Sequence, residues 1–263
     1  IWPDALVYDG SLKKNSLSYK FLKKLELMQY RNADWICSAL PNVHSYIKET
    51  GGDPKKISYV RNGTELNTSF KKYVPNNDIN IVYVGTIAHA HDVISVIKAL
   101  DIIRKRNIKQ KFIFNIYGDG VKRGELQNYI SMKKLENIFF KGSIPKDEVI
   151  KVLEHGDILV CPVLDSKAYS WGLNLNKLYD YFAAGRPVLI SSPLVENDVT
   201  IASCGYSCRA ERPDLIADAL EDFSRLHEER KIEMSLKARV FAEENFDIKK
   251  IVDKFETMVR MFI

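Results

Sequence analysis

The chain has 263 residues, of which 46% are hydrophobic, 28% are charged and 11% are aromatic. This composition excludes a disordered chain, which would be less apolar, and predicts a globular protein. At about 150 residues per domain, the length falls between one domain and two. The net charge of +5 suits an anionic small ligand or an acidic membrane surface, and no tract of five or six basic residues demands nucleic acid.

The cysteines and the N-terminus limit the class of protein further. Cys37, Cys161, Cys204 and Cys208 are too few and too irregularly spaced for a disulfide framework or a zinc site. No run of about 18 apolar residues occurs, so we expect no membrane-spanning helix, and the first ten residues lack the pattern of a signal peptide. The chain begins with Ile rather than Met, so we expect it to be a fragment.

The first part of the chain predicts two strand-helix steps. Residues 16–34 have the pattern of a helix, residues 34–39 of a short strand, residues 41–51 of a helix opened by proline and ended by glycine, and residues 57–60 of another strand. Two such steps are too few to close a sheet of their own. Residues 61–78, with Asn-Gly and Pro-Asn turn signals, are expected to form a linker.

From Asn80 onward, short β-branched runs alternate with stretches of helical period. The runs are apolar on both faces, as in strands that helices cover on both sides. They occupy residues 79–85, 111–118, 137–142, 157–163, 186–192 and 205–210. This strict alternation predicts parallel strands joined by right-handed crossovers, and therefore a doubly wound α/β sheet.

Two helices without a strand between them are predicted at residues 227–246 and 247–263. The last helix carries one apolar stripe, formed by Ile248, Ile251, Val252, Phe255, Val259 and Phe262. Such a stripe fits docking on protein or on a membrane surface. Asp253 and Glu256 dilute the basic face, which favours protein.

Ligands of open parallel sheets bind beyond the carboxyl ends of the strands, so the loops there are candidate sites. In the loop at residues 85–92, Gly85 and Thr86 are small enough for an anion to approach the backbone, and a helix N-terminus follows. His89 and His91 could add positive charge, or they could be ordinary solvated histidines. A metal pair is disfavoured because no third ligand is evident.

The loop at residues 118–124 has the Gly-x-Gly pattern around Asp119 and Gly120. An NAD site is not predicted, because Arg123 stands at the third glycine position and Lys141 where a ribose-binding acid belongs. The turn could face a phosphate or be purely structural. In the first case, Lys122 and Arg123 are possible charge partners.

The third candidate is the segment 170–187, where a loop rich in Gly and Asn runs into a predicted helix of about two turns. The helix N-terminus could hold a phosphate. Asp180 is expected on the same side as Asn176 and Lys177, where it could accept two hydrogen bonds from the ribose diol. The alternative is a solvated acid paired with Lys177.

The segment GLNLNKLYDYFAAGRPVLIS resembles the G-x-S-P-N-K-L-x-D/E-Y-x-A-x-G-K-P-V-I segment of family 4 glycosyltransferases. These enzymes are retaining and metal-independent, use nucleotide sugars and have the two-domain GT-B fold. The segments ISYVRNG, IVYVG, FNIYGDGVKRGEL and IFFKGSIPKDEV resemble further parts of the family in the same order. The opening WPDALV resembles bacterial members that transfer N-acetylated amino sugars.

The resemblance implies a donor-binding set of residues: Gly85, Thr86, Asp119, Gly120, Ile144, Asn174, Leu175, Asn176 and Asp180. Asp180 takes the place of the second glutamate of the family's E-x7-E motif, which holds the ribose hydroxyls. The loop 174–176 would meet the diphosphate through backbone N–H groups, Asp119 and Gly120 would lie near the nucleotide, and Ile144 would lie where backbone groups contact the base.

This chain also departs from the family pattern. The first glutamate of E-x7-E falls at Gly172, and the usual Arg and Lys of the first loop are replaced by Thr86 and His91. The cation for the leaving diphosphate must then come from a set that the sequence leaves open: His91, Lys122, Arg123 or Lys177. No metal motif such as D-x-D is present, so neither a metal nor another cofactor is expected.

The resemblance implies three segments: residues 1–75 as the end of an acceptor domain with its linker, 76–230 as a donor-binding Rossmann-like domain, and 231–263 as helices crossing back. It implies transfer of a sugar, expected to be an N-acetylhexosamine, from a UDP-sugar to a lipid-linked or saccharide acceptor in bacterial surface-polysaccharide or capsule synthesis. The expected location is cytoplasmic, with peripheral association at the inner face of the membrane. The alternatives are a GT-B nucleotide-sugar epimerase and a non-catalytic sugar-nucleotide binding module.

Overall fold

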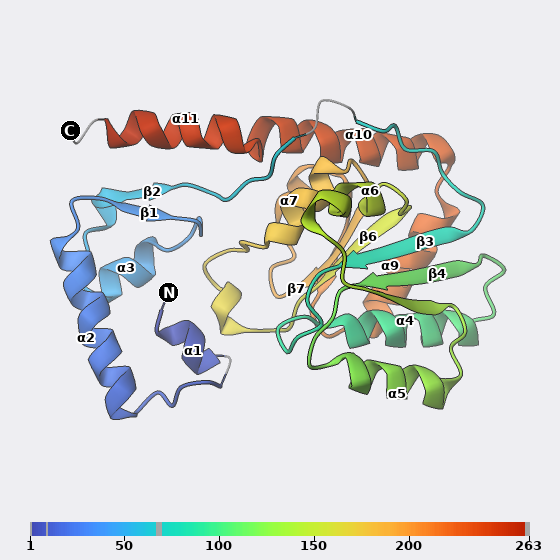
Figure 1. The fold of residues 1–263 in the computed structure, drawn as a ribbon, viewed down its shortest axis with the longest axis horizontal. Coiled ribbons are helices and arrows are strands. Elements are labelled where there is room, and N and C mark those ends of the chain that lie inside the picture. The colour runs from blue at the N-terminus through green and yellow to red at the C-terminus, as the bar shows by residue number, and fades with distance from the viewer. Residues whose placement is uncertain (1, 9, 67–69, 261–263) are drawn as a thin grey trace. The chain divides into compact units, whose positions relative to one another are not determined.

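The computed structural model describes residues 2–8, 10–66 and 70–260 (Figure 1). The chain forms two compact units. Unit 1 comprises Ile1–Asn62, Ser166–Asn174 and Ile251–Ile263, and unit 2 comprises Gly63–Asp165 and Leu175–Lys250. Within the described ranges, no helix combines the length and the apolar character needed to cross a bilayer.

Unit 2 is built on a six-stranded, fully parallel sheet with the strand order β5-β4-β3-β6-β7-β8. Its strands are β3 (Ile79–Val84), β4 (Phe112–Tyr117), β5 (Ile138–Gly142), β6 (Ile158–Pro162), β7 (Val188–Ser192) and β8 (Gly205–Arg209). All six lie inside the predicted runs, and the doubly wound sheet is confirmed. From β3 the chain adds β4 and β5 toward one edge of the sheet, and from β6 it adds β7 and β8 toward the other edge. The carboxyl ends of β3 and β6 therefore flank the switch point, where such sheets bind ligands.

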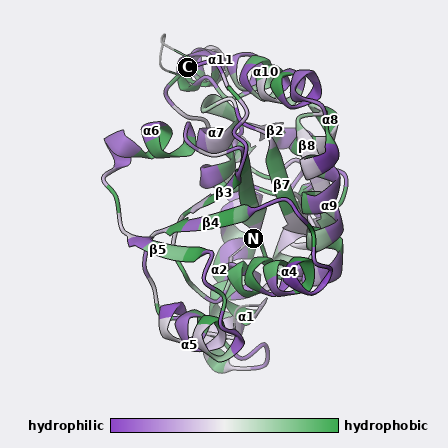
Figure 2. Cartoon of the chain, turned by 90° about the vertical axis from the view of Figure 1, so that its right-hand side faces the viewer, coloured by the Kyte–Doolittle hydropathy of each residue, from purple (hydrophilic) through white to green (hydrophobic). Residues whose placement is uncertain are grey.

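Helices cover both faces of this sheet (Figure 1). The helices on one face are α4 (Val93–Lys105), α5 (Arg123–Lys133) and α9 (Pro213–Arg225), and those on the other are α6 (Val149–Leu153), α7 (Asn176–Ala183) and α10 (Glu228–Asn245). The short elements are η2 (Lys146–Glu148) and α8 (Asp198–Ile201). Because both faces are covered, the strands are apolar on both sides, and Figure 2 shows hydrophobic residues predominating along the central strands.

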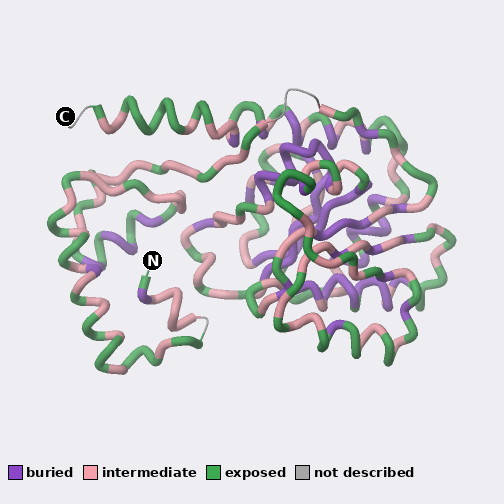
Figure 3. Tube along the Cα trace, in the orientation of Figure 1, coloured by how far each residue is buried: buried purple, intermediate pink, exposed green. Residues whose placement is uncertain are grey.

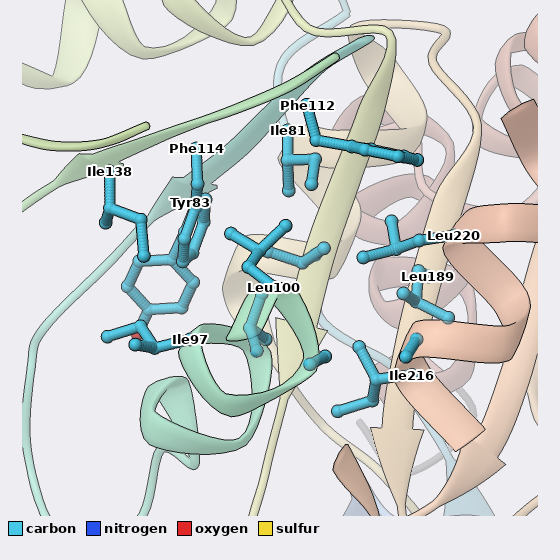
Figure 4. Packing of buried hydrophobic residues seen from close by; sticks show 14 of the residues in the cluster. Ile81, Tyr83, Ile97, Leu100, Phe112, Phe114, Ile138, Leu189, Ile216 and Leu220 are labelled. Atoms are coloured by element: carbon cyan, nitrogen blue, oxygen red, sulfur yellow. The ribbon is translucent and has the colours of Figure 1, made fainter. Parts of the chain in front are cut away.

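The main core lies between the sheet and the helices α4 and α9 (Figure 4). Ile81 and Phe114 project from the strands, and Leu100 of α4 meets Ile216 and Leu220 of α9 against them. All five side chains are buried. The apolar residues of α4 recur with the period of a helix, and successive side chains of a strand point to opposite faces of the sheet, which brings these residues together.

The linker into unit 2 is tied to the sheet by a buried carboxylate. Asp157, which directly precedes β6, accepts hydrogen bonds from the hydroxyl of Tyr73 at 2.9 Å, from the backbone N–H of Asn76 at 3.1 Å and from that of Asn80 at 2.8 Å. Its exposed fraction is 1%. The side chain therefore fixes both the end of the linker and the start of β3.

The C-terminal end of α7 is held by α10. Gly185, just beyond α7, has φ of +57°, and a Cβ there would come within 2.3 Å of the ring of Phe70. The hydroxyl of Ser235 donates to the Gly185 carbonyl at 2.7 Å, and Arg239 donates to the Ala183 carbonyl at 2.9 Å. α10, expected among the helices that cross back, thus packs within unit 2.

Unit 1 contains the helices α1 (Asp4–Tyr8), α2 (Leu17–Asn32) and α3 (His44–Glu49), the 3-10 turns η1 (Pro54–Lys56) and η3 (Lys167–Tyr169), and the parallel strands β1 (Ile36–Ser38) and β2 (Ile57–Tyr59). α11 (Ile248–Val259) begins in unit 2 and continues in unit 1. Phe262, expected on its apolar stripe, lies outside the described residues.

Unit 1 has a small core, in which Val43, Tyr46 and Ile47 are buried. Figure 3 shows by colour where the buried residues lie along the chain. The helix predicted from Pro41 starts three residues later, at His44. The prediction of its start was wrong because the residue after the proline is bonded outside the helix. The backbone N–H of Asn42 donates to the carbonyl of Trp171 at 3.0 Å.

Candidate functional site

The first two candidate loops run side by side beyond the carboxyl ends of β3 and β4. The backbone N–H of Ile87 donates to the Asp119 carbonyl at 2.9 Å. A Cβ on Gly118 would come within 1.9 Å of the Gly85 carbonyl oxygen, and one on Gly120 within 2.3 Å of the Ile87 carbonyl oxygen. The Gly-x-Gly pattern is therefore required by the close approach of the two loops, whatever ligand they face.

Lys177 of α7 reaches beneath the first loop. Its ammonium group donates to the hydroxyl of Tyr83 at 2.9 Å and lies 4.6 Å from the centre of that ring. The Tyr83 hydroxyl donates in turn to the Thr86 carbonyl at 2.7 Å. A Cβ on Gly85 would come within 2.9 Å of the Lys177 nitrogen. Burial lowers the pKa of Lys177 to about 8.

His91 sits beside the same tyrosine but is poorly suited to carry charge. Its ring centre lies 6.5 Å from that of Tyr83, and its Nδ1 atom is buried without a hydrogen-bond partner among the described residues. Burial, reinforced by the charge of Lys177, lowers the pKa of His91 to about 4. A neutral imidazole at pH 7 argues against His91 as the cation for a diphosphate.

The other two candidate cations are paired with acids of their own turn. Lys122 bonds to Glu125 at 2.5 Å, and Arg123 bonds to Asp119 at 3.2 Å. Both pairs are near the surface. Of the three lysine and arginine candidates, Lys177 is the one for which the described part of the chain records no carboxylate within ion-pair distance.

Asp180 lies one turn further along α7 and is buried, with an exposed fraction of 7%. One carboxylate oxygen accepts the Thr64 hydroxyl at 2.7 Å, and the other accepts Lys146 at 2.5 Å. The alternative of a solvated acid paired with Lys177 is therefore wrong. Lys146 follows Ile144 by two residues, so this contact brings the expected base-contacting loop to α7.

Thr64 and Lys146 are site residues that the sequence did not predict. They lie 116 and 34 residues from Asp180 in the chain, so no spacing rule connects them to it. The signal available for Lys146 was its place in the same loop as Ile144. Thr64 belongs to the linker, whose backbone also pairs with residue Asp247.

The start of α7 divides between the two units. Leu175 is the N-cap, with an apolar side chain that cannot accept a hydrogen bond, and Asn176 begins the helix in unit 2. Asn174 belongs to unit 1. In that unit, Gly172 has φ of +123°, and a Cβ there would come within 2.4 Å of Pro41. A glutamate at position 172 would therefore be strained, which accounts for the missing first acid of E-x7-E.

The structure thus gathers the predicted residues into two clusters joined by α7. The first is formed by Gly85, Thr86, His91, Asp119, Gly120 and Lys177 with Tyr83, and the second by Thr64, Lys146 and Asp180, with Ile144 two residues before Lys146 in the chain. In the ranges that the structure describes, no three His, Cys, Asp or Glu side chains form a metal-binding group.

Known proteins resemble this chain at low identity. A probable glycosyltransferase of Pseudomonas aeruginosa, WbjE, is 21% identical over 241 residues, which cover 86% of this chain and 58% of the relative. The chain spans less than two thirds of the length of the curated relatives it matches.

Solved structures show the fold. The Anabaena protein Alr3699/HepE, in complex with UDP and glucose, matches 92% of this chain and 67% of its own with a TM-score of 0.72 at 12% identity. The pneumococcal O-GlcNAc transferase GtfA, in complex with UDP and GlcNAc, matches 96% of this chain and 50% of its own with a TM-score of 0.68 at 16% identity. The fold is therefore that of the GT-B glycosyltransferases. The family model described as glycosyl transferases group 1 matches residues 65–239, which are well over half of this chain, and the chain therefore belongs to that family.

Proposed function

We propose that unit 2 binds the donor of a retaining, metal-independent transfer from a UDP-sugar. The observation that carries this proposal is that Lys177 and Asp180, each with partners of its own, lie on the same short helix. They are three residues apart, which corresponds to roughly 4.5 Å along the helix axis. An ammonium group without a carboxylate partner suits a diphosphate, and a carboxylate suits the adjacent ribose hydroxyls.

The leaving diphosphate would be stabilised by Lys177 together with the backbone of the first loop and the N-terminus of α7. Burial makes this charge more effective than a solvated one, since the local dielectric constant is lower than that of water. Positive character would develop at the anomeric carbon of the sugar while the bond to the diphosphate breaks. Groups that act on the acceptor are expected outside the residues of unit 2.

The sugar and the acceptor are further parts of the proposal. UDP occurs in the solved complexes of both the Anabaena and the pneumococcal protein, and the second also contains GlcNAc. Together with the opening WPDALV, this supports an N-acetylhexosamine donor. The acceptor would be a lipid-linked or other saccharide, as in surface-polysaccharide or capsule assembly, met at the cytoplasmic face of the membrane.

Calorimetric titration of UDP into the whole chain tests the donor site. Replacing Asp180 with alanine removes the acceptor for the ribose hydroxyls, so the dissociation constant should rise by about tenfold or more. Asp222→Ala is the matched control, because this exposed acid of α9 is paired with Arg225 outside both clusters and should change affinity little. Equal UDP affinity in wild type and Asp180→Ala, or no heat from wild type at millimolar UDP, would contradict the assignment.

UDP affinity should also decline as the pH rises above the pKa of Lys177. The pKa of this buried lysine is about 8 in the free protein, and a bound diphosphate raises it, so binding above pH 8 requires uptake of a proton. The affinity should fall by up to about tenfold per pH unit there and be flat below. Calorimetry in two buffers of different ionisation enthalpy measures the uptake, and Lys177→Met should abolish it.

A further inference from the structure

Both oxygens of the Asp180 carboxylate have donors within the protein itself. Oδ1 accepts the Thr64 hydroxyl at 2.7 Å, and Oδ2 accepts the Lys146 ammonium group at 2.5 Å. With both partners in place, the exposed fraction of the Asp180 side chain is 10%. A ribose ring that is to donate to this carboxylate must therefore displace at least one of the groups that cover it.

Thr64 is a fixed partner, because its backbone is bonded on both sides. Its N–H donates to the Phe246 carbonyl at 2.9 Å, and its carbonyl accepts the N–H of Ile248 at 3.2 Å. The ring of Phe246 is buried and lies against that of Tyr179 in α7, with ring centres 4.7 Å apart. The Thr64 hydroxyl cannot leave Asp180 unless the linker separates from the end of α10.

Lys146, in contrast, approaches the carboxylate from the solvent side. It lies in η2, where Asp147 and Glu148 are exposed as well, and the exposed fraction of its side chain is 77%. η2 leads directly into α6, which packs against α7 (Figure 1). A released lysine side chain regains its rotamer freedom, and its ammonium group is hydrated again. Of the two partners, Lys146 is therefore the one that a ligand can displace.

The ion pair has a function before any ligand binds. A buried carboxylate without a partner would be costly, and Lys146 provides the opposite charge that Asp180 requires. Lys177, three residues earlier on α7, donates to the Tyr83 hydroxyl instead. The folded protein needs Asp180 paired and the ribose needs it accessible, and a partner that can leave satisfies both requirements.

We propose that Lys146 is an affinity-determining residue of the donor site: it pairs with Asp180 until the ribose hydroxyls replace its ammonium group. The inference rests on the proposed function, because it takes Asp180 as the group that holds the ribose. Oδ1 has a second lone pair and can keep Thr64 while it accepts one hydroxyl, and Oδ2 exchanges Lys146 for the other. Part of the binding free energy is then used to break a charged hydrogen bond, so Lys146 lowers the affinity for the nucleotide.

This proposal reverses the sign that is expected of a cation beside an anionic ligand. A lysine that attracts the diphosphate, or that donates to the base, would strengthen nucleotide binding, and its removal would weaken it. A lysine that competes with the ribose has the opposite effect. The direction of the change in affinity therefore distinguishes the two roles.

Calorimetric titration of UDP into the whole chain measures this direction. Lys146→Met removes the competing ammonium group, and Lys151→Met, at an exposed lysine of α6, is the matched control that removes the same charge. The loss of charge by itself should weaken UDP binding similarly in both variants. Lys146→Met should nevertheless bind UDP about threefold to fivefold more tightly than Lys151→Met, the upper range for an ion pair with an exposed member.

Uridine provides a second measurement, which needs no variant. It presents the ribose hydroxyls without the charge of the diphosphate. Its affinity for wild type should rise with ionic strength, because salt weakens the ion pair that the ribose has to break. In Lys146→Met, uridine should bind more tightly than in wild type at low salt, and its affinity should not depend on salt.

Lys146→Met should fold as wild type does, because loss of this exposed side chain opens Oδ2 of Asp180 to water. Circular dichroism checks this, and Lys146→Gln, which keeps a neutral donor, should have an intermediate UDP affinity. In an Asp180→Ala background, Lys146→Met and Lys151→Met should bind UDP equally, since no carboxylate is left to release.

Weaker or equal UDP binding by Lys146→Met relative to Lys151→Met would overturn this inference, and so would a uridine affinity of wild type that does not rise with salt. Both results leave the donor site itself in place as long as Asp180→Ala still weakens UDP binding. If Asp180→Ala binds UDP as tightly as wild type does, the ribose contact of the proposed function is wrong, and the role of Lys146 falls with it.

Discussion

Replacing Lys177 with methionine should weaken UDP binding by about tenfold to a hundredfold, the range expected for one hydrogen bond to a charged group. Methionine keeps an unbranched chain of similar length that packs against Tyr83, and it removes the ammonium group alone. Calorimetry at pH 7 and low salt measures the change. Uridine is the matched ligand: it lacks the diphosphate, so its affinity should be the same for wild type and Lys177→Met.

Lys122→Met is the matched control protein. Lys122 is a cation of the neighbouring loop, but it is paired with Glu125 at the surface, so its removal should change UDP affinity by less than about twofold. Lys177→Met should also unfold at the same temperature as wild type or higher, since burial disfavours the charged lysine. If Lys122→Met lost more affinity than Lys177→Met, the diphosphate would be held by the other loop.

The fold of unit 2 was predictable because its signals are local. Runs such as 79–85 and 157–163 are apolar on both faces and are bounded by small or polar residues, which is enough to identify strands covered on both sides. The start of α3 was not predictable in this way. Asn42, which precedes the helix, is held by the distant Trp171, and a proline pattern carries no information about such a contact.

The candidate site was predictable in part for the same reason. The spacing of Lys177 and Asp180 indicates that they share a helix, but their partners come from other elements. Lys146, from another element, forms an ion pair with Asp180. Burial lowers the pKa of His91, so that its ring is neutral, and it lowers the pKa of Lys177 as well. The choice among the four candidate cations therefore required the tertiary structure.

Asp157→Ala should lower the free energy of unfolding by about 3–5 kcal/mol, because it leaves buried donors of the linker and of β3 without an acceptor. The Tyr73 hydroxyl and the backbone N–H groups of Asn76 and Asn80 all lose their partner. Asp157→Asn retains one carbonyl oxygen and should lose about half as much. Urea unfolding followed by circular dichroism measures both.

Asp147→Ala, an exposed acid of η2, is the control and should change stability by less than about 0.5 kcal/mol. Asp157 lies at the amino end of the sheet and the site at the carboxyl end, so the folded fraction of Asp157→Ala should bind UDP as wild type does. Unfolding at the same urea concentration as the control would mean that the linker is held by other contacts, such as the bonds from Arg186 to the Lys71 carbonyl. Lost UDP affinity without lost stability would mean instead that the start of β3 determines the geometry of the loop that follows it.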